Sequence, residues 1–140
     1  MLNIYTTNVI FLIIVFVLAL IGKILSPEII LSFIIAFTFE LFQFAVTQFI
    51  AKLIYFIALL LIINIIANLV WKKSLVSLIL FIPIWFVSLF AYLYNLPVDC
   101  GCFGEIFTLP THISHLIFNT IILLSLSINF YLEKKSISIK

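Results

Sequence analysis

Arginine is absent from the sequence, and charged residues of any kind fill only 9% of its 140 positions. About a quarter of the residues of an ordinary soluble domain are charged and about half are apolar, whereas 66% are apolar here. A soluble fold of this size has too little interior to bury so many Phe, Ile and Leu side chains. The lysines form no basic stripe that could follow a phosphate backbone, so nucleic-acid binding is also excluded. The mean hydropathy of +1.45 therefore indicates a membrane protein.

Long apolar runs predict four membrane-spanning helices. A helix rises about 1.5 Å per residue and needs roughly 20 apolar residues to cross a hydrocarbon core about 30 Å thick. Such runs occupy residues 9–25, 53–71, 75–94 and 112–132, and Thr111 is the predicted N-cap of the last. We therefore expect an all-α, four-helix transmembrane bundle that forms a single domain over residues 1–140.

The segment 29–51 is long enough to cross a bilayer but contains polar residues. A continuous helix from this segment through the second predicted span would be about 65 Å long, so a break is expected near residues 47–52. We predict an interfacial or re-entrant helix, with a five-span arrangement as the alternative in which Glu40 becomes a candidate proton or partner site. The expected polar stripe consists of Ser32, Glu40, Gln43 and Thr47.

The distribution of lysine predicts the orientation in the membrane. Lysines mark the cytoplasmic side of membrane proteins. They fall between the second and third predicted spans and after the fourth, whereas residues 95–111 contain none. We therefore expect both termini to be cytoplasmic and the connection 95–111 to lie outside. Lys23 and Lys52 would then lie near the outer surface, which their long aliphatic stems allow them to reach.

Glycine and cysteine are scarce, with three and two residues, and they concentrate in that outer connection. Cys100 and Cys102 flank Gly101, and Gly104 follows. A Cys-x-Cys disulfide closes a very small ring, which is expected to be strained, easily reduced and oxidising towards other thiols. The same small ring removes little entropy from the unfolded chain, so it is a poor structural clip. The pattern favours thiol–disulfide exchange on the side of the membrane where disulfides persist.

Two histidines near the start of the last span leave other interpretations open. His112 and His115 share a helix face, and together with Cys100 and Cys102 they could enclose zinc or Cu(I) tetrahedrally. They could also modulate the thiols, or lie at the membrane interface with no chemical role. We predict no metal site, and keep a non-catalytic scaffold or metal-handling protein as the alternative function.

Asparagines lie within two of the predicted spans. Asn119 is one helical turn beyond His115, and Asn64 and Asn68 form an i, i+4 pair on the second span. Amides inside a membrane usually form hydrogen bonds between helices, which is the role expected here. A path for protons or electrons is the alternative.

The sequence Asp99-Cys100-Gly101-Cys102-Phe103-Gly104 resembles the signature of the MauE-like membrane proteins, which are grouped with the DoxX-like proteins. The stretch from Gly22 to Pro27 is similar to the end of that family's first helix. The family often has an acidic residue and a glycine at the start of its second helix, and residues 52–58 contain neither.

The resemblance implies a multi-pass protein of the bacterial inner membrane that supports disulfide formation in exported proteins. Cys100 and Cys102 would then be the reactive residues, supported by Asp99, Phe103 and the two glycines of the motif. In the family's founding system, the exported partner is the small subunit of methylamine dehydrogenase, aided by a thioredoxin-fold protein. We accordingly expect an extracytoplasmic thioredoxin-fold or cysteine-containing partner.

The electron acceptor of such a protein is not evident from the sequence. There is no second cysteine pair to carry electrons inward. Quinone fills this role in other four-helix disulfide generators, so a quinone cofactor is suggested here by analogy with their fold alone. Activity as a thiol–disulfide oxidoreductase is the expectation that follows.

Overall fold

The computed structural model describes residues 2–44, 46–96 and 112–137, and the only regular secondary structure within these ranges is helical. The helices are α1 (Leu2–Leu25), α2 (Pro27–Phe42), α3 (Gln48–Val70), α4 (Ser74–Leu93) and α5 (His112–Ile137). The predicted all-α fold class is confirmed.

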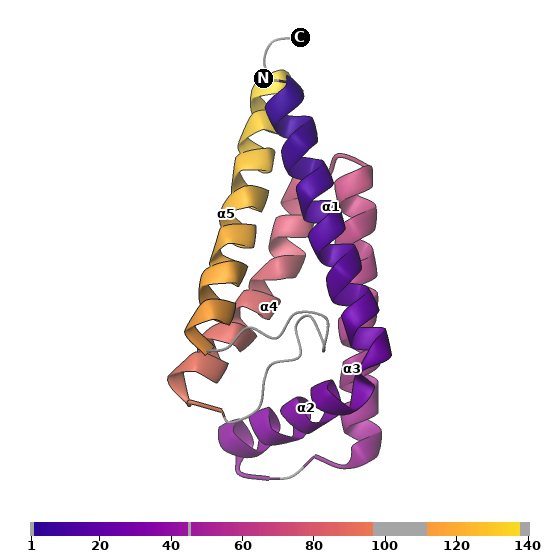
Figure 1. The fold of residues 1–140 in the computed structure, drawn as a ribbon, viewed down its shortest axis with the longest axis vertical. Helices are drawn as coiled ribbons and strands as arrows, with labels where there is room; N and C mark the ends of the chain where they lie inside the picture. The colour runs from indigo at the N-terminus through magenta and orange to yellow at the C-terminus, as the bar shows by residue number, and fades with distance from the viewer. Residues whose placement is uncertain (1, 45, 97–111, 138–140) are drawn as a thin grey trace.

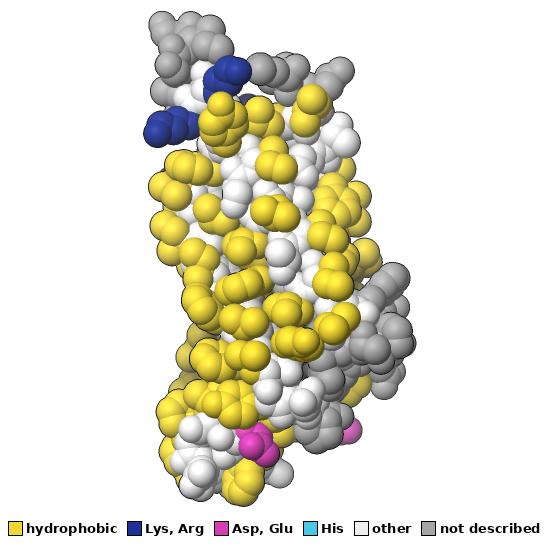
Figure 2. All heavy atoms as spheres, turned by 90° about the vertical axis from the view of Figure 1, so that its left-hand side faces the viewer, with side chains coloured by type: hydrophobic (Ala, Val, Ile, Leu, Met, Phe, Trp, Pro, Cys, Tyr) yellow, Lys and Arg dark blue, Asp and Glu magenta, His cyan; other side chains and the backbone are white. Residues whose placement is uncertain are grey.

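Within the described ranges, four helices are long and apolar enough to cross a membrane: Ile4–Leu25, Gln48–Val70, Ser74–Leu93 and Ile113–Lys135. They run side by side along the long axis of the molecule, and both chain ends lie at the same end of the bundle (Figure 1). Apolar side chains cover the visible flank of the bundle (Figure 2). Such a surface is stable only in contact with lipid, so the predicted bundle of four membrane helices is confirmed.

Buried side chains from all four long helices form the central core. Leu12 of α1, Ile65 of α3 and Leu126 of α5 are fully buried there. Phe16 of α1 and Phe81 of α4 pack edge to face, with ring centroids 5.6 Å apart.

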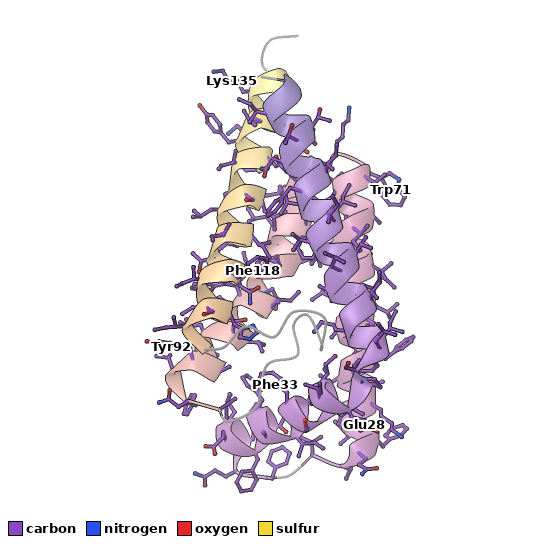
Figure 3. The ribbon with its side chains drawn as sticks, in the orientation of Figure 1. Glu28, Phe33, Trp71, Tyr92, Phe118 and Lys135 are labelled. Atoms are coloured by element: carbon purple, nitrogen blue, oxygen red, sulfur yellow. The ribbon has the colours of Figure 1, made fainter. Side chains whose placement is uncertain are left out.

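The short helix α2 lies across the end of the bundle opposite the chain ends (Figure 1). Its Phe33 is buried against Ala91 and Leu96 at the end of α4, and its Ile30 packs with Ala51 at the start of α3. Phe33 lies on the side of α2 that faces the long helices (Figure 3). At 16 residues, α2 is about 24 Å long, less than the hydrocarbon thickness, which favours four spans over five. Its position at the membrane interface stays a prediction.

The break between α2 and α3 comes earlier than expected. Helix α2 ends at Phe42 because Gln43 adopts the left-handed conformation with φ 56°, and its N–H is bonded to the carbonyl of Phe39. Gln43 and Thr47 therefore lie beyond the helix, and the predicted four-residue polar stripe on one helix is wrong. Glu40 is exposed near the end of α2.

In three connections the chain changes direction at a residue other than glycine whose backbone is in the left-handed conformation. These residues are Gln43, Lys72 and Asn95, with φ of 56°, 57° and 46°. Glycine is the usual residue at such positions. Gly22 instead lies buried inside α1, Gly101 belongs to the Cys-Gly-Cys motif, and Gly104 follows that motif by two residues.

A carboxylate joins three helices at the end of the bundle that carries the termini. Glu133 of α5 accepts hydrogen bonds from the Tyr5 hydroxyl at 2.6 Å, the Ser74 hydroxyl at 2.6 Å and the Ser74 N–H at 3.1 Å. Since Ser74 is the first residue of α4, the negative charge also faces the positive end of that helix. The amide of Asn8 adds a bond from α1 to the side chain of Asn129, which is fully buried.

We predict that Glu133→Gln destabilises the bundle. The amide that replaces one oxygen cannot accept a hydrogen bond, so at least one donor loses its acceptor, at a cost of about 1–3 kcal/mol. Thermal unfolding in detergent micelles, followed by circular dichroism, should show a lower midpoint. Glu28→Gln removes an exposed carboxylate from α2 and serves as the control. Equal midpoints for the two variants would contradict the role given to Glu133.

Candidate functional site

The predicted reactive segment connects α4 to α5. Cys100, Cys102 and the supporting residues Asp99, Gly101, Phe103 and Gly104 all lie in residues 97–111, outside the described residues. The helices that this segment joins are described: α4 ends at Leu93, and α5 begins at His112. Both of these helix ends are at the end of the bundle opposite the chain termini (Figure 1).

The two histidines follow this segment in the first turn of α5. His112 is the first residue of the helix, and its side chain is outside the described residues, as is the predicted N-cap Thr111. The His115 side chain is 6% exposed, so it packs inside the bundle and does not lie at a lipid or water surface. Its interpretation as an interface residue stays a prediction, because burial within the protein does not define the depth of a residue in the membrane. Among the described residues, no group of three His, Cys, Asp or Glu side chains could hold a metal ion. The four-ligand alternative involves the cysteines and is therefore not tested.

One turn beyond His115, the amide of Asn119 donates a hydrogen bond to the hydroxyl of Ser88 on α4. Both side chains are buried, with exposed fractions of 3% and 4%. The indole N–H of Trp85 donates to the hydroxyl of Thr120 at 3.1 Å, a second polar link between the same helices. Such bonds stabilise helix pairs in a membrane, where the hydrophobic effect does not drive helix association.

The expectation of hydrogen bonds between helices is confirmed for Asn119 and wrong for the asparagine pair of α3. The Asn64 amide donates to the carbonyl of Leu60, and the Asn68 amide donates to the carbonyl of Asn64. Both bonds stay within α3, where Asn64 is exposed and Asn68 is half-buried.

A cavity of about 270 Å³ lies between the five helices, on the α2 side of the central core. Three of its described lining residues are polar: Lys23 of α1, Thr38 of α2 and Asn119 of α5. The others are apolar: Val15, Phe16, Ala19, Phe33, Ile34, Phe37, Ile54, Ala58, Ile62, Phe81, Ile84, Val87 and Ile122. This is the composition of a small-molecule site, with an apolar wall and a few polar groups that converge on it.

A hydrogen bond from α3 to the backbone carbonyl of Lys23 fixes the position of this residue. The Tyr55 hydroxyl of α3 donates to the Lys23 carbonyl at 2.8 Å, next to the buried Gly22, which lets α1 and α3 approach closely. The sequence predicted that Lys23 would extend to the outer surface, but its side chain lines the cavity. Lys23 is half-buried there, and its reach to the outer surface stays a prediction.

Sequence reasoning missed this cavity. The one signal available was a lysine in an apolar run, which also fits a side chain that reaches the surface. The cavity depends on which faces of five helices meet, and these helices are apolar around their whole circumference, so hydrophobic periodicity does not define the faces.

Comparison with known proteins identifies the family. The family model described as "Methylamine utilisation protein MauE" matches residues 1–132. No curated protein and no solved structure matches the chain. The match covers the first three candidate spans, the Cys-Gly-Cys motif and all but the last three residues of the fourth span, and so agrees with the resemblance noted in the sequence. The chain belongs to the MauE family of membrane proteins.

Proposed function

We propose that this MauE-family protein is a membrane thiol–disulfide redox protein that supports disulfide formation or maturation of exported proteins. The observation that carries the proposal is the placement of both cysteines of the chain, Cys100 and Cys102, on either side of Gly101 between α4 and α5. Membership of a family described by methylamine utilisation supports a membrane role in that process. The target in that process would be an exported protein that contains several disulfides.

The charge distribution supports an extracytoplasmic position for the motif. Lysine side chains cluster at the end of the bundle that carries the termini, whereas acidic side chains are visible at the other end (Figure 2). Lys135 lies at the first end, and Tyr92, close to the end of α4, lies towards the second (Figure 3). By the positive-inside rule, the lysine-rich end is cytoplasmic. The helix ends on either side of the motif then face the compartment in which disulfides persist, and a thioredoxin-fold partner would meet the motif there.

In the proposed exchange, atoms and electrons balance between the Cys100–Cys102 disulfide and two thiolates of the partner. A thiolate of the partner attacks one sulfur of the Cys100–Cys102 disulfide, forms a mixed disulfide and releases the other sulfur as a thiolate. The partner's second thiolate then attacks the mixed disulfide. The partner leaves oxidised, and the Cys100–Cys102 pair is left as a dithiol. The reverse sequence reduces the partner, so the relative potentials of the two pairs set the direction.

We predict that replacing the cysteines one at a time traps a mixed disulfide. In Cys100→Ser or Cys102→Ser, one remaining thiol has no neighbour to resolve the adduct, so one of the two variants should accumulate a covalent complex with an exported protein. Acid-quenched and alkylated cells, analysed on non-reducing gels, measure this directly. The Cys100→Ser, Cys102→Ser double variant is the control and should form no adduct.

If neither single variant traps a partner and both retain full support of exported-protein oxidation, the exchange mechanism is wrong. A loss of bound zinc or copper from the double variant would favour the metal-handling alternative instead.

We also predict that the motif reacts from outside the cell. In the Cys100→Ser variant, a membrane-impermeant maleimide should label Cys102 in intact, briefly reduced cells. A cysteine placed at the C-terminus by Lys140→Cys in the double-serine background should react only after permeabilisation. The opposite pattern would place the thiols in the cytoplasm and remove the basis for an exported partner.

A further inference from the structure

The cavity between the five helices has a chemistry that the thiol proposal does not use. Its described wall comes from residues of all four spans and of α2. The described part of the wall is apolar except at three side chains, which are the described groups that can form hydrogen bonds with a bound molecule.

Two of the three polar side chains can donate to a bound molecule. The hydroxyl of Thr38 already donates to the carbonyl of Ile34 at 2.8 Å, within its own helix. Lys23 offers an amine with several N–H donors and carries the one positive charge in the described wall. The Asn119 amide has two N–H donors and uses one of them for Ser88. The donors come from α1 and α5, so they lie on different walls of the cavity.

The volume is sufficient for a ring or a short chain. An apolar cavity of about 150 Å³ already binds benzene. The volume of about 270 Å³ found here therefore admits a substituted ring or several methylene groups.

We infer that this cavity binds a lipophilic molecule that carries hydrogen-bond-accepting oxygens, with Lys23 and Asn119 as the donors that select it. A carboxylate on an alkyl chain and a ring that bears carbonyl groups share this chemistry. The apolar body of the molecule contacts Phe33, Phe81 and Ile122, and its oxygens face the lysine and the amide. The inference concerns binding alone and does not rest on the proposed function.

Three decyl compounds test this inference on the purified full-length protein in phospholipid nanodiscs. Decanoate carries a carboxylate, a decyl-substituted para-benzoquinone carries ring carbonyls, and decylbenzene carries no oxygen. Bound compound is quantified by mass spectrometry, with nanodiscs that contain no protein as the background. At least one oxygen-bearing compound should bind at one per protein, about tenfold or more tightly than decylbenzene. A preference for decanoate would identify an anionic ligand, and a preference for the quinone would identify a neutral one.

Matched variants connect the binding to this cavity. Lys23→Met and Asn119→Leu remove a donor each and should weaken binding of the preferred compound about tenfold. Lys52→Met and Asn64→Leu remove the same side chains from exposed positions on α3 and should leave binding unchanged. Ala58→Phe fills the cavity and should abolish binding, and Ala19→Leu is a smaller filling change for use if the larger one fails to fold.

Three results would overturn the inference: equal binding of decylbenzene, unchanged binding in both filling variants, or equal effects of the lining and exposed substitutions. Since the readout is binding, any of these results leaves the thiol proposal standing. Conversely, failure to trap a mixed disulfide would leave this binding site intact.

Discussion

The packing of α2 across one end of the long helices is the contact on which much of the architecture depends. Ile30 and Phe33 bury it against the start of α3 and the end of α4. Because α2 lies across the end of the bundle, α1 and α3 run in opposite directions, and the four long helices bring both chain ends to the same end of the bundle (Figure 1). The same helix supplies Phe33, Phe37 and Thr38 to the cavity wall. Without α2, the cavity would lose one of its sides.

Several polar groups of the chain join one helix to another. Glu133 joins α1, α4 and α5 at the lysine-rich end, and Asn119 joins α5 to α4 through Ser88. In hydrocarbon, a polar group left without a partner costs several kcal/mol, so each such bond also fixes which helix faces meet. Apolar packing alone would specify these faces poorly, because the helices are apolar on every side. A small number of hydrogen bonds therefore determines the register of the bundle.

The sequence predicted the number and approximate position of the spans well, because span length follows directly from the thickness of the bilayer. It was less accurate at the helix ends. The polar residues before Val9 were left outside the first span, yet α1 begins at Leu2, because Tyr5 and Asn8 bond to α5. The break after Phe42 has no glycine or proline to mark it, and depends on a left-handed glutamine. The cavity and the position of Lys23 were not predictable, since they depend on tertiary contacts between residues far apart in the chain.

Helix α5 connects the two regions to which we assign chemistry. It begins directly after the Cys-Gly-Cys segment, buries His115 in its first turn and brings Asn119 to the cavity about one turn later. A ligand that forms a hydrogen bond with Asn119 competes with, or adds to, the hydrogen bond from Asn119 to Ser88. The bond to Ser88 fixes α5 against α4, and these are the two helices that the Cys-Gly-Cys segment connects. If occupancy of the cavity alters the thiol–disulfide equilibrium, reciprocity requires that the redox state of the pair alter ligand affinity by the same factor. The two proposals therefore become quantitatively linked through one helix, although each is tested separately.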